Sequence, residues 1–206
     1  MCIRDRASEI KAKLALVDHN LIELDASHGT VALLQPGAMI GLGAIAKGYA
    51  VDRAAKIMRA RGFPNVIVEG GGDVFVSGSK GPQSWQVGVQ DPTRRGAVGQ
   101  VDVTNEAVVT SGNYQRFFEF EGVRYAHILD PRTGRPIPFE DSPRSVTVVA
   151  ADATRADAYA TALAVLGREA GLRLANQLGG VEAIFCLLYT SPSPRDQRGS
   201  RMPSSA

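Results

Sequence analysis

The sequence contains little of several residue types, and each shortage excludes a class of protein. Only two cysteines, Cys2 and Cys186, occur among 206 residues, too few for a disulfide framework or a cysteine-rich zinc site. Lysine and arginine (23) barely outnumber aspartate and glutamate (21), so we expect no nucleic-acid partner, because such binding needs many phosphate contacts. No apolar run approaches the ~20 residues of a membrane-spanning helix, and no signal-peptide pattern opens the chain. The composition is that of an ordinary globular protein with one domain.

The two ends of the chain differ from its middle. Residues 191–206 read SPSPRDQRGSRMPSSA, and such a polar stretch cannot bury an apolar face. The first six residues, MCIRDR, are also unpatterned. We therefore expect a folded domain over residues 7–188, with non-native or disordered tails over 1–6 and 189–206.

The middle of the chain predicts short strands and a few helices. Apolar residues four apart predict a helix over Ala44–Arg61, a second over Thr154–Leu166 that ends at Gly167, and a third that follows to Leu178. Apolar or alternating runs between turn residues predict the strands Leu21–Leu24, Thr30–Leu34, Val66–Val68, Val74–Val76, Trp85–Val89, Val98–Val103, Ala107–Thr110, Gln115–Glu121, Arg124–Leu129, Ser145–Ala150 and Ala183–Leu188. Because helices and strands do not alternate regularly, we expect an α+β fold with mainly antiparallel sheets packed with helices, rather than a doubly wound parallel sheet.

A glycine-rich segment, Gly41–Ala46, leads into the first of these helices. Its sequence GLGAIA matches the outline of a dinucleotide-binding turn, but no acidic residue ends the next strand at the expected distance. Lys47 is followed by Gly48 rather than by the Ser or Thr of a P-loop. Glycines before a helix still expose its first N–H groups, which favour a phosphate. A phosphate site and a closely packed helix start both remain open.

Asp157 and Thr161 lie four residues apart on the predicted second helix and therefore share a face. Their neighbours are mainly alanines, which leave room for a ligand. A carboxylate and a hydroxyl are oxygen donors that suit Mg²⁺. The alternative is a threonine bonded to a helix carbonyl and an aspartate at the surface.

Two further segments carry polar groups that suit a site. His127 lies near the end of a predicted strand, before a loop of turn-forming residues, and a histidine at such a buried edge can act as a general base. A lone histidine is more often structural. Thr110, Ser111 and Gly112 lie at a strand-to-turn junction, where they line a pocket or simply cap a turn.

Five motifs follow one another in an order that resembles the ApbE family of FAD:protein FMN transferases. They are GAIAKGYAVD (43–52), EGGGD (69–73), VTSGNY (109–114), HILDPRTG (127–134) and ADAYATAL (156–163). The resemblance covers about residues 20–188 and implies an ApbE-like fold. It implies Mg²⁺-dependent transfer of FMN from FAD to a Thr or Ser hydroxyl of an acceptor protein, with release of AMP. Two alternatives are an FAD pyrophosphatase that gives FMN and AMP, and a flavin-binding protein without catalysis.

The resemblance also implies roles for individual residues. Asp157 and Thr161 would bind Mg²⁺ through their side chains, with the backbone carbonyls of Ala44 and Ala160 as further ligands. His127 would be the base for the acceptor hydroxyl, and the loop 130–134 would shape the pocket. The flavin-binding residues would be Lys47, Ile128, Gly43, Ala44, Thr110, Ser111 and Gly112.

The chain departs from the family pattern at position 41 and at its ends. Gly41 stands where the family usually has an acidic residue that helps to hold FAD. The match begins and ends inside the family's usual length, so we expect the domain to be incomplete at the N-terminus and at the C-terminus. By analogy with the family, we expect a periplasmic or membrane-anchored protein outside the cytoplasm, with peripheral membrane association through an N-terminal anchor that this sequence does not show.

Overall fold

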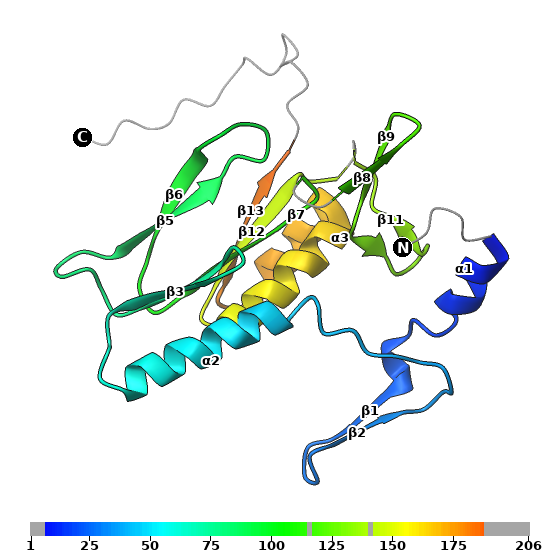
Figure 1. Ribbon diagram of the computed structural model, residues 1–206, viewed down its shortest axis with the longest axis horizontal. Coiled ribbons are helices and arrows are strands. Elements are labelled where there is room, and N and C mark those ends of the chain that lie inside the picture. The colour runs from blue at the N-terminus through cyan, green and yellow to red at the C-terminus, as the bar shows by residue number, and fades with distance from the viewer. Residues whose placement is uncertain (1–6, 115–116, 140–141, 188–206) are drawn as a thin grey trace.

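The computed structural model describes residues 7–114, 117–139 and 142–187 (Figure 1). At its centre is a five-stranded sheet in the order β13-β12-β7-β4-β3, and each neighbouring pair of strands is antiparallel. The strands are β3 (Val66–Gly70), β4 (Asp73–Ser77), β7 (Ala107–Gly112), β12 (Ser145–Ala150) and β13 (Val181–Cys186). The predicted α+β fold with mainly antiparallel pairing is confirmed.

Two helices, α2 (Ala46–Ala60) and α3 (Ala153–Gln177), pack against each other and against one face of this sheet (Figure 1). The core between helices and sheet contains many alanines on the helix side and valines on the sheet side. Small helical side chains let the helices lie close to the strands. At Gly167 the backbone of α3 leaves the helical region, with φ of 75° and ψ of −179°. The predicted boundary between two helices therefore exists as a break inside α3.

The opposite face of the sheet is covered by a hairpin of β5 (Trp85–Gln90) and β6 (Ala97–Val103). Val103 and Trp85 of this hairpin join a second apolar cluster with Val76 and Val149 of the sheet. Strand β12, which lies between β13 and β7, is buried along its whole length because it is covered from both sides. The sheet is therefore the middle layer of three.

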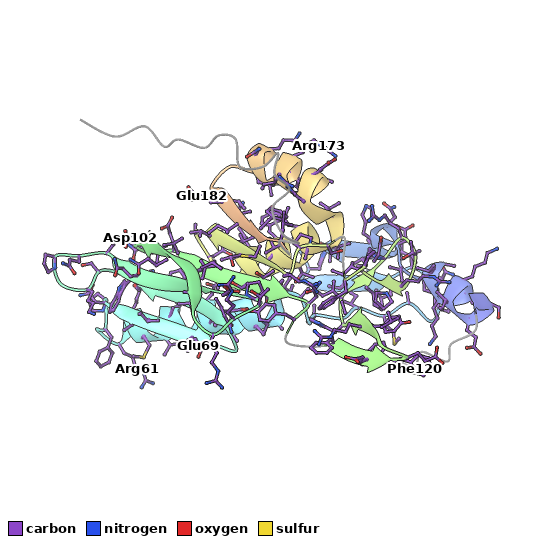
Figure 2. The ribbon with its side chains drawn as sticks, turned by 90° about the horizontal axis from the view of Figure 1, so that it is seen from above. Arg61, Glu69, Asp102, Phe120, Arg173 and Glu182 are labelled. Atoms are coloured by element: carbon purple, nitrogen blue, oxygen red, sulfur yellow. The ribbon has the colours of Figure 1, made fainter. Side chains whose placement is uncertain are left out.

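Three smaller antiparallel hairpins lie outside the main sheet. They are β1 (Ile22–Asp25) with β2 (Thr30–Leu33), β8 (Phe117–Phe120) with β9 (Val123–Ala126), and β10 (Leu129–Asp130) with β11 (Arg135–Pro136). Figure 2 shows Asp102 of β6 and Phe120 of β8 at opposite ends of an elongated molecule. The hairpins β8–β9 and β10–β11 therefore lie away from β5–β6.

Several elements differ from those predicted. The short helices α1 (Ala7–Leu14) and η1 (His19–Leu21) were not expected. The predicted strand Arg124–Leu129 is interrupted at residues 127–128, because β9 ends at Ala126 and β10 begins at Leu129. The predicted ends at Gln115 and Leu188, and the tails 1–6 and 189–206, lie outside the described residues. Within the described part of the chain, no helix has both the length and the apolar character needed to span a membrane.

Candidate active site

One pocket of about 490 Å³ gathers residues from five separate parts of the chain. Its walls come from the start of α2, the turn after β3, the end of β7, the segment 127–129 and the middle of α3. Ten of the eleven site residues that the sequence predicts line it: Gly43, Ala44, Lys47, Thr110, Ser111, Gly112, His127, Ile128, Asp157 and Thr161. The other lining residues are Gly71, Leu129 and Val165. The structure thus brings these residues together, while their chemical roles remain predictions.

Ala160 and the loop 130–134 do not line this pocket. Ala160 is a residue of α3 and is fully buried in the core between the helices and the sheet. The loop forms a closed turn in which Asp130 accepts hydrogen bonds from the backbone N–H of Arg132 and from its guanidinium. The Arg132 guanidinium holds the pKa of the Asp130 carboxyl below its usual value. The loop's expected role in shaping the pocket is therefore not seen; Leu129, just before it, lines the wall instead.

A larger cavity, of about 680 Å³, lies between β9 and the segment 135–139. It contains none of the predicted site residues, and no carboxylate lines it. We place the site in the smaller pocket for two reasons. A metal ion requires oxygen ligands such as carboxylates and hydroxyls, and a nucleotide phosphate requires a cationic group beside them.

The side chain of Asp157, on α3, is held against the start of α2. Its side chain is only 2% exposed, and its Oδ2 accepts a hydrogen bond from the backbone N–H of Gly48 at 3.1 Å. At the same helix start, the N–H of Ala46 donates to the carbonyl of Leu42 at 2.9 Å. The expected exposed N–H groups are therefore partly used inside the protein. The carboxylate is not at the surface, in contrast to one of the two interpretations of the sequence.

The approach of α2 to α3 requires glycine at position 48. A Cβ added to Gly48 would lie 2.1 Å from the carbonyl oxygen of Ala153. Four residues further along α2, the Asp52 carboxylate accepts hydrogen bonds from the backbone N–H groups of Ala153 and Thr154, both at 2.8 Å. Asp52 thus caps the N-terminus of α3 from the neighbouring helix. Two contacts one turn apart fix α3, and with it Asp157, against α2.

The Thr161 hydroxyl faces β7. Its Oγ1 lies 3.0 Å from the Ser111 Oγ, and Thr110 makes a similar pair with Thr147 of β12 at 2.8 Å. The hydrogen bond between the Ser111 and Thr161 hydroxyls links α3 to β7 at the pocket wall. Asp157 and Thr161 therefore line the same pocket from one helix, and their role as metal ligands stays a prediction.

Asp73, the first residue of β4, is a buried acid for which the sequence suggested no role. Its side chain is 0% exposed, and its Oδ1 accepts a hydrogen bond from Lys47 Nζ at 2.6 Å. Burial raises the pKa of Asp73 to about 6, the negative charge of Asp157 raises it as well, and Lys47 opposes both effects. The only sequence signal was an acid placed directly after three glycines at the start of a buried strand.

The raised pKa of Asp73 predicts a pH dependence of stability in the metal-free protein. The folded state binds this proton more tightly than the unfolded state, whose value is the ordinary 3.8, so Asp73 stabilises the fold at low pH. That stabilisation is lost as the pH rises through about 6, and we expect about 2 kcal/mol to disappear between pH 4 and pH 7.5. Urea unfolding in EDTA, compared with Asp73→Asn at each pH, measures the difference; a difference that does not change with pH contradicts the prediction.

His127 lies between β9 and β10 and is exposed. The expectation of a histidine at a buried edge is therefore wrong, because the strand that was to bury it is interrupted there. It lines the same pocket as Asp157 and Lys47. Its neighbour Ile128 is buried, and the Ile128 carbonyl accepts a hydrogen bond from the N–H of Ile137 at 3.0 Å. The backbone after His127 is thus fixed, and His127 itself is exposed.

The donor set of the pocket fits a magnesium ion. Among the described residues, no group of three or more His, Cys, Asp or Glu side chains is placed to hold a metal ion together. Three residues that line the pocket carry suitable donors: Asp157 has a carboxylate, Thr161 a hydroxyl and Ala44 a backbone carbonyl. Mg²⁺ commonly takes few protein ligands and completes its shell with phosphate and water.

Comparison with known proteins identifies the family. The ApbE family model matches residues 3–185. An FAD:protein FMN transferase of Klebsiella pneumoniae is 38% identical over 181 residues, which are 87% of this chain and 55% of that protein. One of Treponema pallidum is 40% identical over 175 residues, which are 80% of this chain and 48% of that protein.

Solved structures agree with this match. The ApbE protein of Thermotoga maritima superposes with a TM-score of 0.78 at 38% identity, covering 87% of this chain and 58% of that one. The flavin transferase ApbE of Vibrio cholerae gives 0.77 at 29% identity, covering 90% and 58%. The chain spans about half the length of the curated relatives that it matches. On its sequence and its fold, the chain belongs to the ApbE family.

Proposed function

We propose that the protein transfers FMN from FAD to a Thr or Ser hydroxyl of an acceptor protein in a Mg²⁺-dependent reaction that releases AMP. The observation that carries this proposal is the convergence of Asp157, Thr161, Lys47 and His127 on one pocket. The name of the relatives, FAD:protein FMN transferase, supports the same reaction.

In the proposed reaction the acceptor hydroxyl oxygen forms a bond to the FMN-side phosphorus of FAD. The bond from that phosphorus to the bridging oxygen breaks, and AMP leaves with that oxygen. His127 takes the hydroxyl proton, and Lys47 pairs with a pyrophosphate oxygen. Asp157, Thr161 and the Ala44 carbonyl would hold Mg²⁺, which when bound neutralises charge on the phosphate oxygens. The residues of the chain need form no covalent bond to the flavin.

The proposal predicts the products of one incubation. With FAD, Mg²⁺ and an acceptor carrying a Thr or Ser site, we expect AMP in solution and a mass increase of the acceptor by one FMN group. Free FMN together with AMP would instead indicate FAD hydrolysis, a candidate that the exposure of His127 favours because water can reach it. FAD binding without AMP would indicate a flavin-binding protein and would contradict both reactions.

A His127→Gln variant tests the proposed base. Removing a general base typically costs 10²–10⁴-fold in rate, so we expect kcat for FMN transfer to fall by roughly 100-fold or more, with the KM for FAD changed by less than about threefold. His28→Gln is the matched control, because His28 lies in the β1–β2 hairpin, bonded to Asp25 at 2.6 Å, and does not line the pocket. Equal kcat values for His127→Gln and wild type would exclude the role.

The family resemblance alone supports the proposed location, which is the periplasm or the outer face of the cytoplasmic membrane. Fractionation of cells that express the full-length protein tests this, with the protein expected in the periplasmic or membrane fraction. Recovery only in the cytoplasm would contradict it.

A further inference from the structure

Asp73 lies behind the pocket wall, where it joins two of the residues that form that wall. Its Oδ1 bonds to Lys47 Nζ at 2.6 Å, and the Asp157 carboxylate is close enough for its charge to act on Asp73. Its Oδ2 has no N–H or hydroxyl donor within the described structure, although the whole side chain is buried, and its close acidic neighbour is the Asp157 carboxyl. A buried carboxylate oxygen without a partner is costly, so its presence calls for a function.

The local charges do not balance. Asp73 and Asp157 are 0% and 2% exposed, whereas the Lys47 side chain that faces them is 45% exposed. Two buried carboxylates beside one half-solvated ammonium group leave net negative charge in a poorly solvated place. Such an arrangement costs stability unless a further cation compensates it. The pocket that Lys47 and Asp157 line is where that cation can approach.

We propose that Asp73 is a positioning residue of the divalent-cation site. Through Oδ1 it holds the Lys47 ammonium at the pocket wall, and through its charge beside Asp157 it raises the affinity of the pocket for the cation. It acts through Lys47 and Asp157 and does not itself line the pocket. This inference rests on the proposed Mg²⁺-dependent function and adds a residue to that site.

An ion pair that served stability alone would behave differently. Losing its acid would weaken the fold, and the affinity for a cation elsewhere would not change. A positioning acid lowers the stability of the metal-free protein, and this loss is offset only when the cation binds and balances the charge. The sign of two separate effects therefore distinguishes the two roles.

The test measures binding of Mn²⁺, used as a paramagnetic probe in place of Mg²⁺, by titration of the 206-residue chain without FAD. We expect Asp73→Asn to weaken Mn²⁺ binding by about 10-fold or more, as found for residues that support metal ligands. Lys47→Met should tighten binding, because it removes a positive charge from the same pocket.

Glu69→Gln is the matched control. Glu69 lies in the same turn, is exposed, and accepts a hydrogen bond from the N–H of Gly72 at 2.7 Å that glutamine can keep. The substitution removes the same charge from a residue that forms no ion pair with Lys47 among the described residues, so we expect Mn²⁺ affinity within about twofold of wild type, since exposed charges are well screened.

The outcomes separate this inference from the proposed function. If the wild-type chain binds no Mn²⁺ or Mg²⁺ at millimolar concentration, the metal-dependent function itself fails. If wild type binds but Asp73→Asn binds equally well, or Glu69→Gln weakens binding as much, only the inference is overturned. Should Asp73→Asn not fold, Asp73→Ser, which also removes the charge, takes its place, and Mn²⁺ binding by that variant as tight as that of wild type overturns the inference.

Discussion

Asp157→Asn is expected to lose nearly all Mg²⁺-dependent release of AMP from FAD. Asp157 is the one charged ligand in the proposed set, and asparagine keeps an oxygen that can accept the hydrogen bond from Gly48, now at 3.1 Å. The change therefore removes charge and preserves shape. Losing a group that stabilises phosphate charge costs about 10²–10³-fold, so we expect the rate to fall by roughly 100-fold or more.

The fold should survive this change, which makes the result interpretable. In the metal-free wild type the negative charge of Asp157 opposes ionisation of Asp73, and asparagine relieves that repulsion. We expect the urea midpoint of Asp157→Asn in EDTA to equal or exceed that of wild type, while Mg²⁺ no longer raises it. Glu169→Gln on the exposed side of α3 is the control for charge, and it should keep full turnover. Normal AMP release by Asp157→Asn would refute the metal site.

The sequence predicts the elements of this fold better than their arrangement. Short apolar runs between glycines and asparagines determine most strands locally, and Gly167, at φ of 75°, ends the first half of α3 where its sequence indicates. The order β13-β12-β7-β4-β3 depends on pairs far apart in the chain, which no local pattern encodes. The break at His127 was missed for a similar reason, since Ile137 bonds to Ile128 across the β10–β11 turn.

The site residues show the same difference between local patterns and contacts between distant parts of the chain. Asp157 and Thr161 could be paired from their spacing on one helix, because four residues return to the same face. Asp73 and Lys47 are 26 residues apart, on different elements, and meet only after α2 packs on the sheet. The capping of α3 by Asp52 joins residues more than 100 positions apart. Interactions within one element are readable from sequence, whereas those that bring elements together require the fold.

Gly48→Ala is expected to lose both stability and turnover, against the usual effect of this substitution. Alanine in place of glycine inside a helix ordinarily stabilises by about 0.5–1 kcal/mol. At Gly48 the added Cβ would lie 2.1 Å from the Ala153 carbonyl oxygen, 2.5 Å from its carbon and 2.9 Å from the Asp157 Cβ. Two of these neighbours are backbone atoms, so α2 and α3 must move apart. Overpacking of this kind costs about 1–3 kcal/mol.

The same movement separates Asp157 from the start of α2, where Ala44 and Lys47 line the pocket. A misplacement of about 1 Å in a catalytic arrangement can cost roughly 100-fold in rate, and we expect a loss of that size in AMP release by Gly48→Ala at a temperature where it remains folded by circular dichroism. Gly41→Ala is the control, because nothing lies within 4 Å of its added Cβ. If Gly48→Ala were as stable and as active as Gly41→Ala, the two helices could not be clamped as the structure shows, and the geometry proposed for the metal ligands would fail with them.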